Sequence, residues 1–173
     1  MKDPLNRDKE IITFTGKYIN VFEPKIEEID IKDIAHALSL QVRFTGHIKC
    51  HYSIAQHSLF VSTHLPFKYK LSGLLHDAAE AYLSDISSPQ KHNMDQFKEI
   101  EHNLMLVIST KFNFVYPLDD EVKLVDKQAL EWEFYNLVYP KRLSIKFWYY
   151  YLIPPFVIEK LFLKRFKLLS NQK

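Results

Sequence analysis

Cysteine and glycine are both scarce in this sequence of 173 residues. The single cysteine, Cys50, excludes a disulfide within the chain and a zinc site built from thiolates, and it favours a reducing, cytoplasmic setting. The 3 glycines are too few for a glycine-rich phosphate loop or a dinucleotide-binding fingerprint. If the protein binds phosphate, side chains and a metal ion must hold it.

Long apolar runs and charge clusters are also missing. The longest uncharged run, 147–158, is too short for a membrane span and contains two prolines. Residues 1–8 lack the apolar segment of a signal peptide. The net charge of +2 and the pI of about 8.5 are only weakly basic. We therefore expect no membrane partner and no stable nucleic-acid complex.

The hydrophobic pattern predicts an all-α fold with a small N-terminal β-hairpin. Two β-favouring segments within 11–22 flank Gly16, which tolerates the positive φ of a hairpin turn. Asp30 and Ser53 are predicted N-caps of helices. The segments predicted to be helical are 30–41, 54–64, 68–83, 95–112, 119–138 and a short basic segment, 156–169.

No repeat or linker divides the chain, so we predict one domain over residues 1–173. The aromatic run Phe147–Tyr151 is interpreted as core or as a subunit contact, and the basic segment 160–167 as a solvated helix face. The predicted parts are a loose N-terminus (1–10), the hairpin (11–22), a helical core (30–138) and an aromatic and basic C-terminal extension (140–173).

A histidine and an aspartate stand side by side in an apolar stretch, and this is the chain's most unusual feature. Burying His76 and Asp77 without partners would cost several kcal/mol. His57 and Asp126 fall on the apolar faces of two other predicted helices. Each residue alone could be a satisfied core group, but the set of four predicts a metal centre. Two imidazoles and two carboxylates suit Mn²⁺, Fe²⁺, Co²⁺ or Zn²⁺ and leave positions open for water and substrate.

Charged residues near this set suggest phosphate chemistry. Glu80 lies one helical turn from His76 and Asp77, so it could be a general acid or base, a ligand of a second divalent ion, or a surface carboxylate. Arg43 and Lys91 could each neutralise phosphate or lie on the surface, and an arginine fork matches phosphate oxygens best.

The pattern His57…His76-Asp77…Asp126 resembles the H…HD…D signature of the HD-domain phosphohydrolases. Longer matched segments are Asp33–Ser39, Arg43–His47, Tyr52–Ser58 and Leu74–Ile86. They resemble small phage and bacterial HD proteins akin to 5′-deoxyribonucleotidases and to DatZ-type dATP triphosphohydrolases. The resemblance covers about residues 11–137 and implies an HD-domain helical bundle.

The resemblance also implies residue roles. His57, His76, Asp77 and Asp126 would hold the catalytic metal, and Glu80 would transfer a proton or hold a second ion. The residues implied to bind substrate are Arg43, Phe44, Asp85 and Lys91. Phe44 departs from the pattern, because the 5′-deoxyribonucleotidases tend to have tryptophan after that arginine. This leaves the base and sugar preference open.

The expected function is hydrolysis of nucleotides, either as a dNMP 5′-nucleotidase or as a dNTP triphosphohydrolase with dATP among its substrates. The resemblance also implies a homo-oligomer, a dimer or a hexamer. The alternative is a non-catalytic HD module that binds a nucleotide for sensing or regulation. His36 and His47 recur in the matched segments, either as residues that orient ligands or as structural hydrogen-bonding groups.

Overall fold

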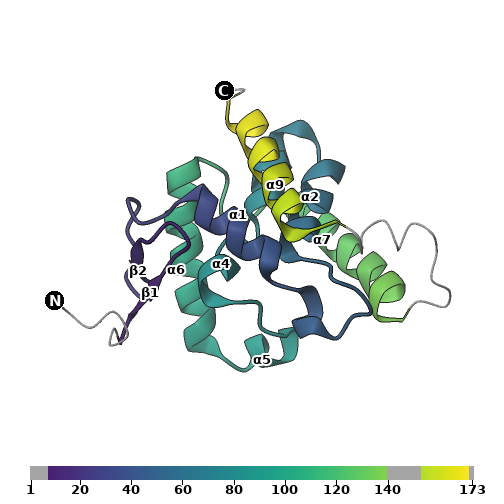
Figure 1. Cartoon of the computed structure of the whole chain (residues 1–173), viewed down its shortest axis with the longest axis horizontal. Coiled ribbons are helices and arrows are strands. Elements are labelled where there is room, and N and C mark those ends of the chain that lie inside the picture. Colours follow the sequence, from purple (N-terminus) through teal and green to yellow (C-terminus); the bar gives the residue numbers. More distant parts are fainter. Residues whose placement is uncertain (1–7, 140–152, 172–173) are drawn as a thin grey trace.

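The structure is a computed structural model that describes residues 8–139 and 153–171. It is mostly helical, with a small antiparallel hairpin near the N-terminus (Figure 1). In chain order the elements are β1 (Glu10–Ile12), β2 (Tyr18–Asn20), α1 (Ile31–Leu40), η1 (Arg43–Gly46), α2 (Ile54–His64), η2 (Phe67–Tyr69), α3 (Lys70–Leu75), α4 (Glu80–Leu83), α5 (Ser88–His92), α6 (Asp95–Phe112), α7 (Asp120–Glu133), η3 (Phe134–Val138) and α9 (Pro155–Ser170).

The hairpin forms where the sequence predicted it. Ile11 pairs with Ile19, and Gly16 in the turn has φ of +81°. Asp33 of α1 holds this turn in place, because its carboxylate accepts hydrogen bonds from the backbone N–H of Thr15 at 2.7 Å and from the Thr15 hydroxyl at 2.9 Å. The hairpin is thereby attached to the helical part of the molecule.

Capping residues begin three of the helices, at Asp30 and Ser53 as predicted and also at Asp119. The Asp30 carboxylate accepts from the Lys32 N–H, and the Asp119 carboxylate accepts from the Glu121 N–H. Ser53 forms a reciprocal capping box with Gln56 at the start of α2. Such caps satisfy backbone donors that a helix leaves unpaired at its first turn.

Four segments differ from the sequence prediction. The helix predicted over 68–83 is divided into η2, α3 and α4, with turns at 76–79. Residues 88–92 and 43–46, for which no helix was predicted, form the short helices α5 and η1. The helix predicted to run to about Val138 changes to a π-helix, η3, after Glu133.

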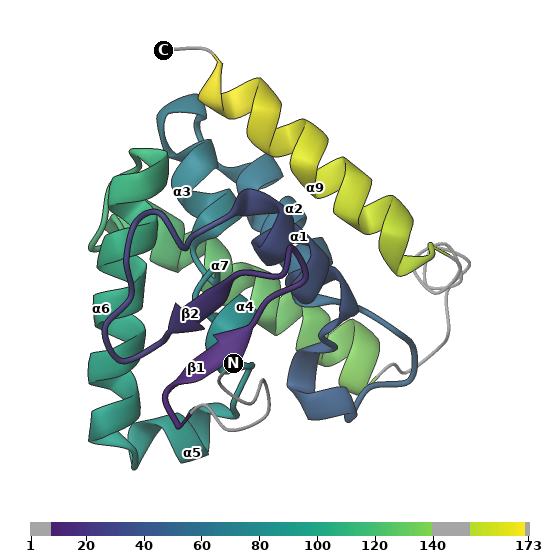
Figure 2. The same cartoon turned by 60° about the vertical axis from the view of Figure 1, so that its left-hand side comes forward.

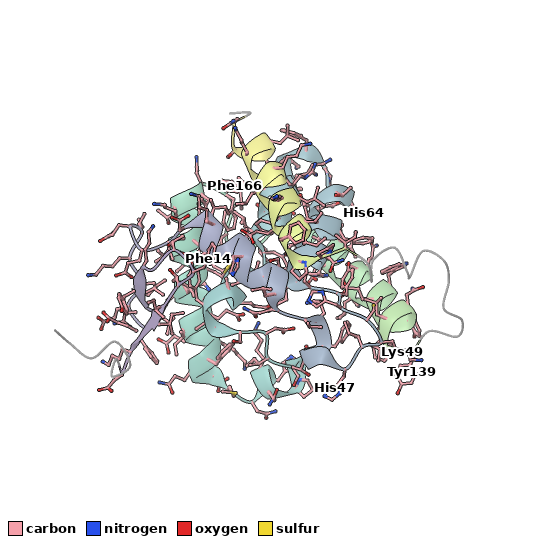
Figure 3. All side chains as sticks on the ribbon, in the orientation of Figure 1. Phe14, His47, Lys49, His64, Tyr139 and Phe166 are labelled. Carbon is pink, nitrogen blue, oxygen red and sulfur yellow. The ribbon has the colours of Figure 1, made fainter. Side chains whose placement is uncertain are left out.

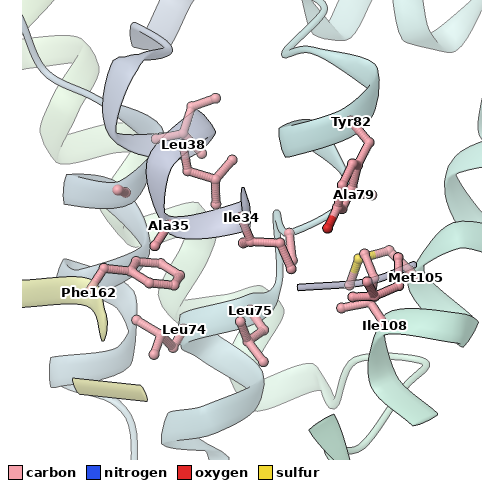
Figure 4. Close-up of a cluster of buried hydrophobic side chains, with 14 of the residues drawn as sticks. Ile34, Ala35, Leu38, Leu74, Leu75, Ala79, Tyr82, Met105, Ile108 and Phe162 are labelled. Atoms are coloured by element: carbon pink, nitrogen blue, oxygen red, sulfur yellow. The ribbon is translucent and has the colours of Figure 1, made fainter. Parts of the chain in front are cut away.

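The main core lies between the hairpin, α1, α3, α6 and α9 (Figure 4). Ile34 and Leu38 of α1 and Leu74 of α3 are fully buried there, as is Phe162 of α9. Helix α9 packs on α1, α2 and α3 and forms one outer side of the molecule (Figure 2). Phe147–Tyr151 lies outside the described residues. No helix within the described ranges is both long and apolar enough to cross a membrane.

Candidate metal centre

Helix α2 carries His57, whose Nε2 is the ring nitrogen left available to bind a metal ion. The side chain is fully buried, and its Nδ1 lies 2.7 Å from Glu133 Oε1. A carboxylate only accepts hydrogen bonds, so Nδ1 carries the hydrogen and Nε2 keeps its lone pair. The capping box at Ser53 places His57 in the first turn of a well-defined helix.

His76 reaches the same point from a break in the chain. Its Nδ1 lies 2.8 Å from the carbonyl oxygen of Gly73, so Nδ1 donates and Nε2 again keeps its lone pair. In a continuing helix that carbonyl would accept the Asp77 N–H, so the side chain competes with the backbone. Instead Ala78 N–H bonds to Leu75 O at 3.0 Å in a tighter turn. This explains why the predicted 68–83 helix is interrupted here.

Gly73 allows α3 to approach α2 closely. A β-carbon at Gly73 would clash with Leu65, which follows α2. The close approach brings the Nε2 atoms of His57 and His76 to 3.1 Å from each other. With both Nδ1 hydrogens engaged elsewhere, two neutral rings would bring their Nε2 lone pairs together. The contact therefore requires a cation, either a proton on Nε2 of His76 or a metal ion.

Two carboxylates complete the cluster. Asp126 Oδ1 is 3.0 Å from His57 Nε2 and 3.6 Å from His76 Nε2. Asp77 Oδ2 is 3.1 Å from His76 Nε2 and 3.6 Å from His57 Nε2. The structure therefore brings together all four residues predicted as ligands. His57, His76 and Asp126 form a group that could hold a metal ion, and Asp77 adjoins it.

The pKa values of the clustered histidine and aspartates are shifted by their mutual contacts. Burial raises the pKa of the Asp77 carboxyl, but His76, His57 and Arg43 outweigh burial and hold that pKa well below its ordinary value. For Asp126, hydrogen bonds with His57 and His76 likewise outweigh burial and lower the pKa. Burial lowers the pKa of His76, whereas Asp77 and Asp126 raise it well above the ordinary value. A cluster of acceptors that attracts protons in this way also suits a metal cation.

Glu133 is part of this site although the sequence analysis did not single it out. Its fully buried carboxylate binds His57 through Oε1, and through Oε2 it accepts from Arg43 Nε at 3.2 Å and Nη2 at 3.0 Å. Arg43 Nη1 is 3.8 Å from Asp77 Oδ2. Burial opposes the charge on Arg43, but Glu133 and Asp77 raise its pKa. The available signal was spacing, because Glu133 follows Asp126 by seven residues, two turns along one helix face.

Glu80 lies beside the cluster, and its surroundings favour the protonated form of its carboxyl group. The residue is 8% exposed, and its Oε2 has no hydrogen-bond partner among the described residues. Burial raises the pKa of Glu80 well above its ordinary value, and the nearby carboxylates of Asp77 and Asp85 raise it further. A carboxyl group that keeps its proton can donate it to a substrate.

A cavity of about 410 Å³ opens beside these groups. It contains Arg43, Phe44, Asp85 and Lys91, the four residues predicted to bind substrate. Leu130 of α7 is 41% exposed and belongs to the cavity wall. The full lining is Arg43, Phe44, Thr45, His47, Asp77, Glu80, Asp85, Ile86, Ser87, Ser88, Pro89, Lys91, Asp126, Leu130 and Val138.

The four residues predicted to bind substrate differ in how strongly they are already held by contacts within the protein. Lys91 is ion-paired with Glu101, and this contact raises the lysine pKa although burial opposes it. Burial raises the pKa of Asp85, as does the Asp77 charge. Phe44 and Thr45 have φ of +55° and +50°, a strained backbone for residues other than glycine. Strain of this kind clusters at functional sites.

The two histidines with open roles separate in the structure. His36 Nδ1 is 3.0 Å from Glu159 of α9, and its ring stacks on Phe14 at 3.7 Å between centroids. This contact joins α1, α9 and the hairpin turn, so His36 has a structural role. His47 lines the cavity. Figure 3 shows Phe14 near α1, and it shows His47 apart from it at the lower edge of the view.

Two curated proteins resemble this chain. The uncharacterized protein YfdR of Escherichia coli is 36% identical over 116 residues, which are 67% of this chain and 65% of YfdR. The uncharacterized protein RCAP_rcc00048 of Rhodobacter capsulatus is 29% identical over 125 residues, 66% of this chain and 64% of that protein. The chain thus spans just under two thirds of the relatives it matches. No protein-family model matches it.

Proposed function

We propose that this protein is a metal-dependent nucleotide phosphohydrolase of the HD-domain superfamily. One observation supports this most strongly. The Nε2 atoms of His57 and His76 face each other at 3.1 Å beside the carboxylates of Asp77 and Asp126, at the edge of a cavity. This is an arrangement of acceptors that fits a divalent transition metal.

The donor set passes a simple chemical test of fit. Both imidazoles are fixed in the tautomer that a metal requires, and hydrogen bonds to Glu133 and Gly73 hold them there. The carboxylates of Asp77 and Asp126 provide negative charge, as does Asp85 nearby. A divalent ion bound by these residues supplies a water of lowered pKa and polarises a phosphoryl oxygen. Manganese, cobalt, zinc or iron would suit the mixed nitrogen and oxygen ligands.

The surrounding side chains have distinct roles in this proposal. Arg43 directs Nη1 toward the cavity side of Asp77 and stabilises charge on the phosphoryl oxygens. Glu80 holds a proton on its carboxyl group and donates it to the leaving oxygen as the phosphorus–oxygen bond breaks. Lys91 contributes less, because Glu101 already neutralises it. A second divalent ion held by Glu80 and Asp85 is the alternative role for these residues, because a carboxylate that ligates a metal cannot also hold the proton.

The proposed substrates are deoxynucleotides. The cavity combines charged residues at the metal centre with an apolar wall formed by Phe44, Ile86, Pro89, Leu130 and Val138. Such a wall suits a flat base, while the charged end suits phosphate. Both a dNMP 5′-nucleotidase and a dNTP triphosphohydrolase that accepts dATP fit this division.

The test is a nucleotide panel with product analysis. The purified protein, loaded with Mn²⁺ or Co²⁺, is incubated with each dNMP and dNTP, and products are separated by chromatography. Free phosphate from a dNMP identifies a nucleotidase, whereas nucleoside and tripolyphosphate from a dNTP identify a triphosphohydrolase. Asp77→Ala should lower turnover by at least ~100-fold, since the loss of a residue that only orients a metal ligand already costs about 10–100-fold. Asp120→Ala, a 96%-exposed position of α7, should keep full activity.

The alternative is a nucleotide-binding HD module without catalysis. It predicts that the metal-loaded protein binds a nucleotide tightly in calorimetry and hydrolyses none of the panel. That result, or turnover that survives Asp77→Ala unchanged, would contradict the hydrolase.

A further inference from the structure

Glu133 is a completely buried carboxylate whose two oxygens serve two different parts of the site. Oε1 lies 2.7 Å from His57 Nδ1, and Oε2 accepts from Arg43 Nε at 3.2 Å and Nη2 at 3.0 Å. Burying a carboxylate is costly unless hydrogen-bond donors satisfy it. Here the donors are His57, a candidate metal ligand, and Arg43, which lies beside the candidate metal centre.

The bond to His57 decides which ring nitrogen is available. Because Oε1 can only accept, it keeps the hydrogen on Nδ1 and the lone pair on Nε2. It also favours the observed ring orientation, because a flipped ring would lose the bond between Nδ1 and Oε1. Partners of this kind raise the affinity of a histidine for metal.

The bonds to Arg43 decide where the guanidinium points. Nε and Nη2 both donate to the same oxygen, so the remaining nitrogen, Nη1, lies toward Asp77 and the cavity. Arg43 is followed by Phe44 and Thr45 at positive φ, so its backbone leaves helical geometry immediately. The anchor that aims the side chain is therefore Glu133 rather than a regular element.

We infer that Glu133 is a positioning residue that couples the metal ligand His57 to the phosphate-binding arginine Arg43. The inference rests on the proposed function and adds a residue to it. One carboxylate sets both the nitrogen that faces the metal and the nitrogen that faces the substrate. A change at Glu133 should therefore alter metal affinity or substrate affinity while the fold is kept.

The test uses Glu133→Gln, which keeps size and removes one acceptor. If the amide oxygen faces His57, the amide nitrogen opposes the donors of Arg43, so KM rises by ~10–100-fold and the Co²⁺ affinity is kept. If the oxygen faces Arg43, the amide donates to His57 Nδ1 and moves its hydrogen to Nε2, so the Co²⁺ affinity falls by ~10–100-fold. Co²⁺ affinity is measured by absorption titration of metal-free protein, and KM on Co²⁺-saturated enzyme.

Matched variants separate positioning from general damage. Glu131→Gln, an exposed position on the same helix, should change neither quantity. In an Arg43→Ala background, Glu133→Gln should add no further increase in KM. If the amide variant does not fold, Glu133→Asp serves instead, because its shorter side chain cannot reach both partners.

The outcomes are distinct. A change in either affinity, with the melting temperature kept, supports the inference. Unchanged Co²⁺ affinity and unchanged KM in a folded Glu133 variant overturn it, as does a KM increase that persists undiminished in the Arg43→Ala background. If the wild type binds Co²⁺ but hydrolyses no nucleotide, the proposed function fails alone. The affinity for inorganic phosphate, measured by calorimetry, then replaces KM as the test of Glu133.

Discussion

Two buried carboxylates on helices, Asp33 of α1 and Glu133 of α7, show how differently the same kind of group can be used. Asp33 is 2% exposed and accepts from the backbone and hydroxyl of Thr15, two neutral donors. Glu133 is 0% exposed and binds Arg43, which lines the cavity, and His57, which faces the acceptor cluster beside it. The first contact ends at a hairpin turn, whereas the second continues into a cluster of acceptors.

Two histidines repeat the contrast. His36 and His57 each place Nδ1 against a glutamate, at 3.0 and 2.7 Å. His36 stacks on Phe14 between α1 and α9, while His57 directs its other nitrogen at His76 and Asp126. A polar contact in the interior therefore indicates a functional site only where acceptors outnumber the donors that the chain supplies.

The largest expected effect separates the two histidines. His57→Gln should lower the Co²⁺ affinity by at least ~100-fold, because a ligand and its fixed tautomer are both lost. His36→Gln should leave the Co²⁺ affinity unchanged and cost about 1 kcal/mol of stability, the value of one hydrogen bond. Absorption titration and thermal unfolding measure these quantities. Equal losses of Co²⁺ affinity in the two variants would remove the distinction between the regions.

The next effect concerns the hairpin side. Asp33→Ala leaves two donors of Thr15 without their acceptor, and it should lower the free energy of unfolding by about 2 kcal/mol. Co²⁺ affinity should stay the same, because this carboxylate has no contact with the cavity. The control is Glu27→Ala, at an exposed position between β2 and α1. It should leave the free energy of unfolding unchanged in denaturant unfolding. A loss of metal binding in Asp33→Ala would show that the two regions are linked.

The smallest effect depends on pH. The raised pKa of Glu80 means that the folded, metal-free protein keeps this proton to higher pH than the unfolded chain. Stability from the protonated form is fully present below the ordinary pKa of about 4.3 and is lost as pH rises through the folded value. Glu80→Gln cannot ionise, so its melting temperature should match the wild type near pH 4 and exceed it near neutral pH.

The control for this prediction is Glu99→Gln, an exposed position on α6. Its melting temperature should follow the wild type at every pH. A wild type that gains stability relative to Glu80→Gln as pH rises would reverse the predicted sign and remove Glu80 from the role of proton donor.

Local signals predicted most of the fold. Asp30, Ser53 and Asp119 begin helices because their side chains cap free backbone donors, a choice made within a few residues. The short helix α5 was missed although Ser87 and Gln90 form a capping box that the sequence already displays. Its few residues bury no apolar face, so periodicity gave no indication of it.

The interruption at His76 could not be predicted locally. It depends on a side chain that takes the Gly73 carbonyl and on the close packing of Gly73 against Leu65. The candidate cluster was predicted because His57 and Asp126 fall on apolar helix faces, where an ionisable group requires a polar partner. Glu133 was not predicted to belong to the site, because a glutamate near the end of a charged helix is usually exposed on the surface.

The position of Asp126 and Glu133 on one helix has a consequence for sequence variation. Seven residues make nearly two turns, so both side chains face α2 together. One residue inserted between them would rotate Glu133 by about 100° and carry it out of reach of His57 and Arg43. Segment 127–132 should therefore accept many substitutions at its outward positions yet tolerate no change of length, and in distant homologues its length should vary less than its composition.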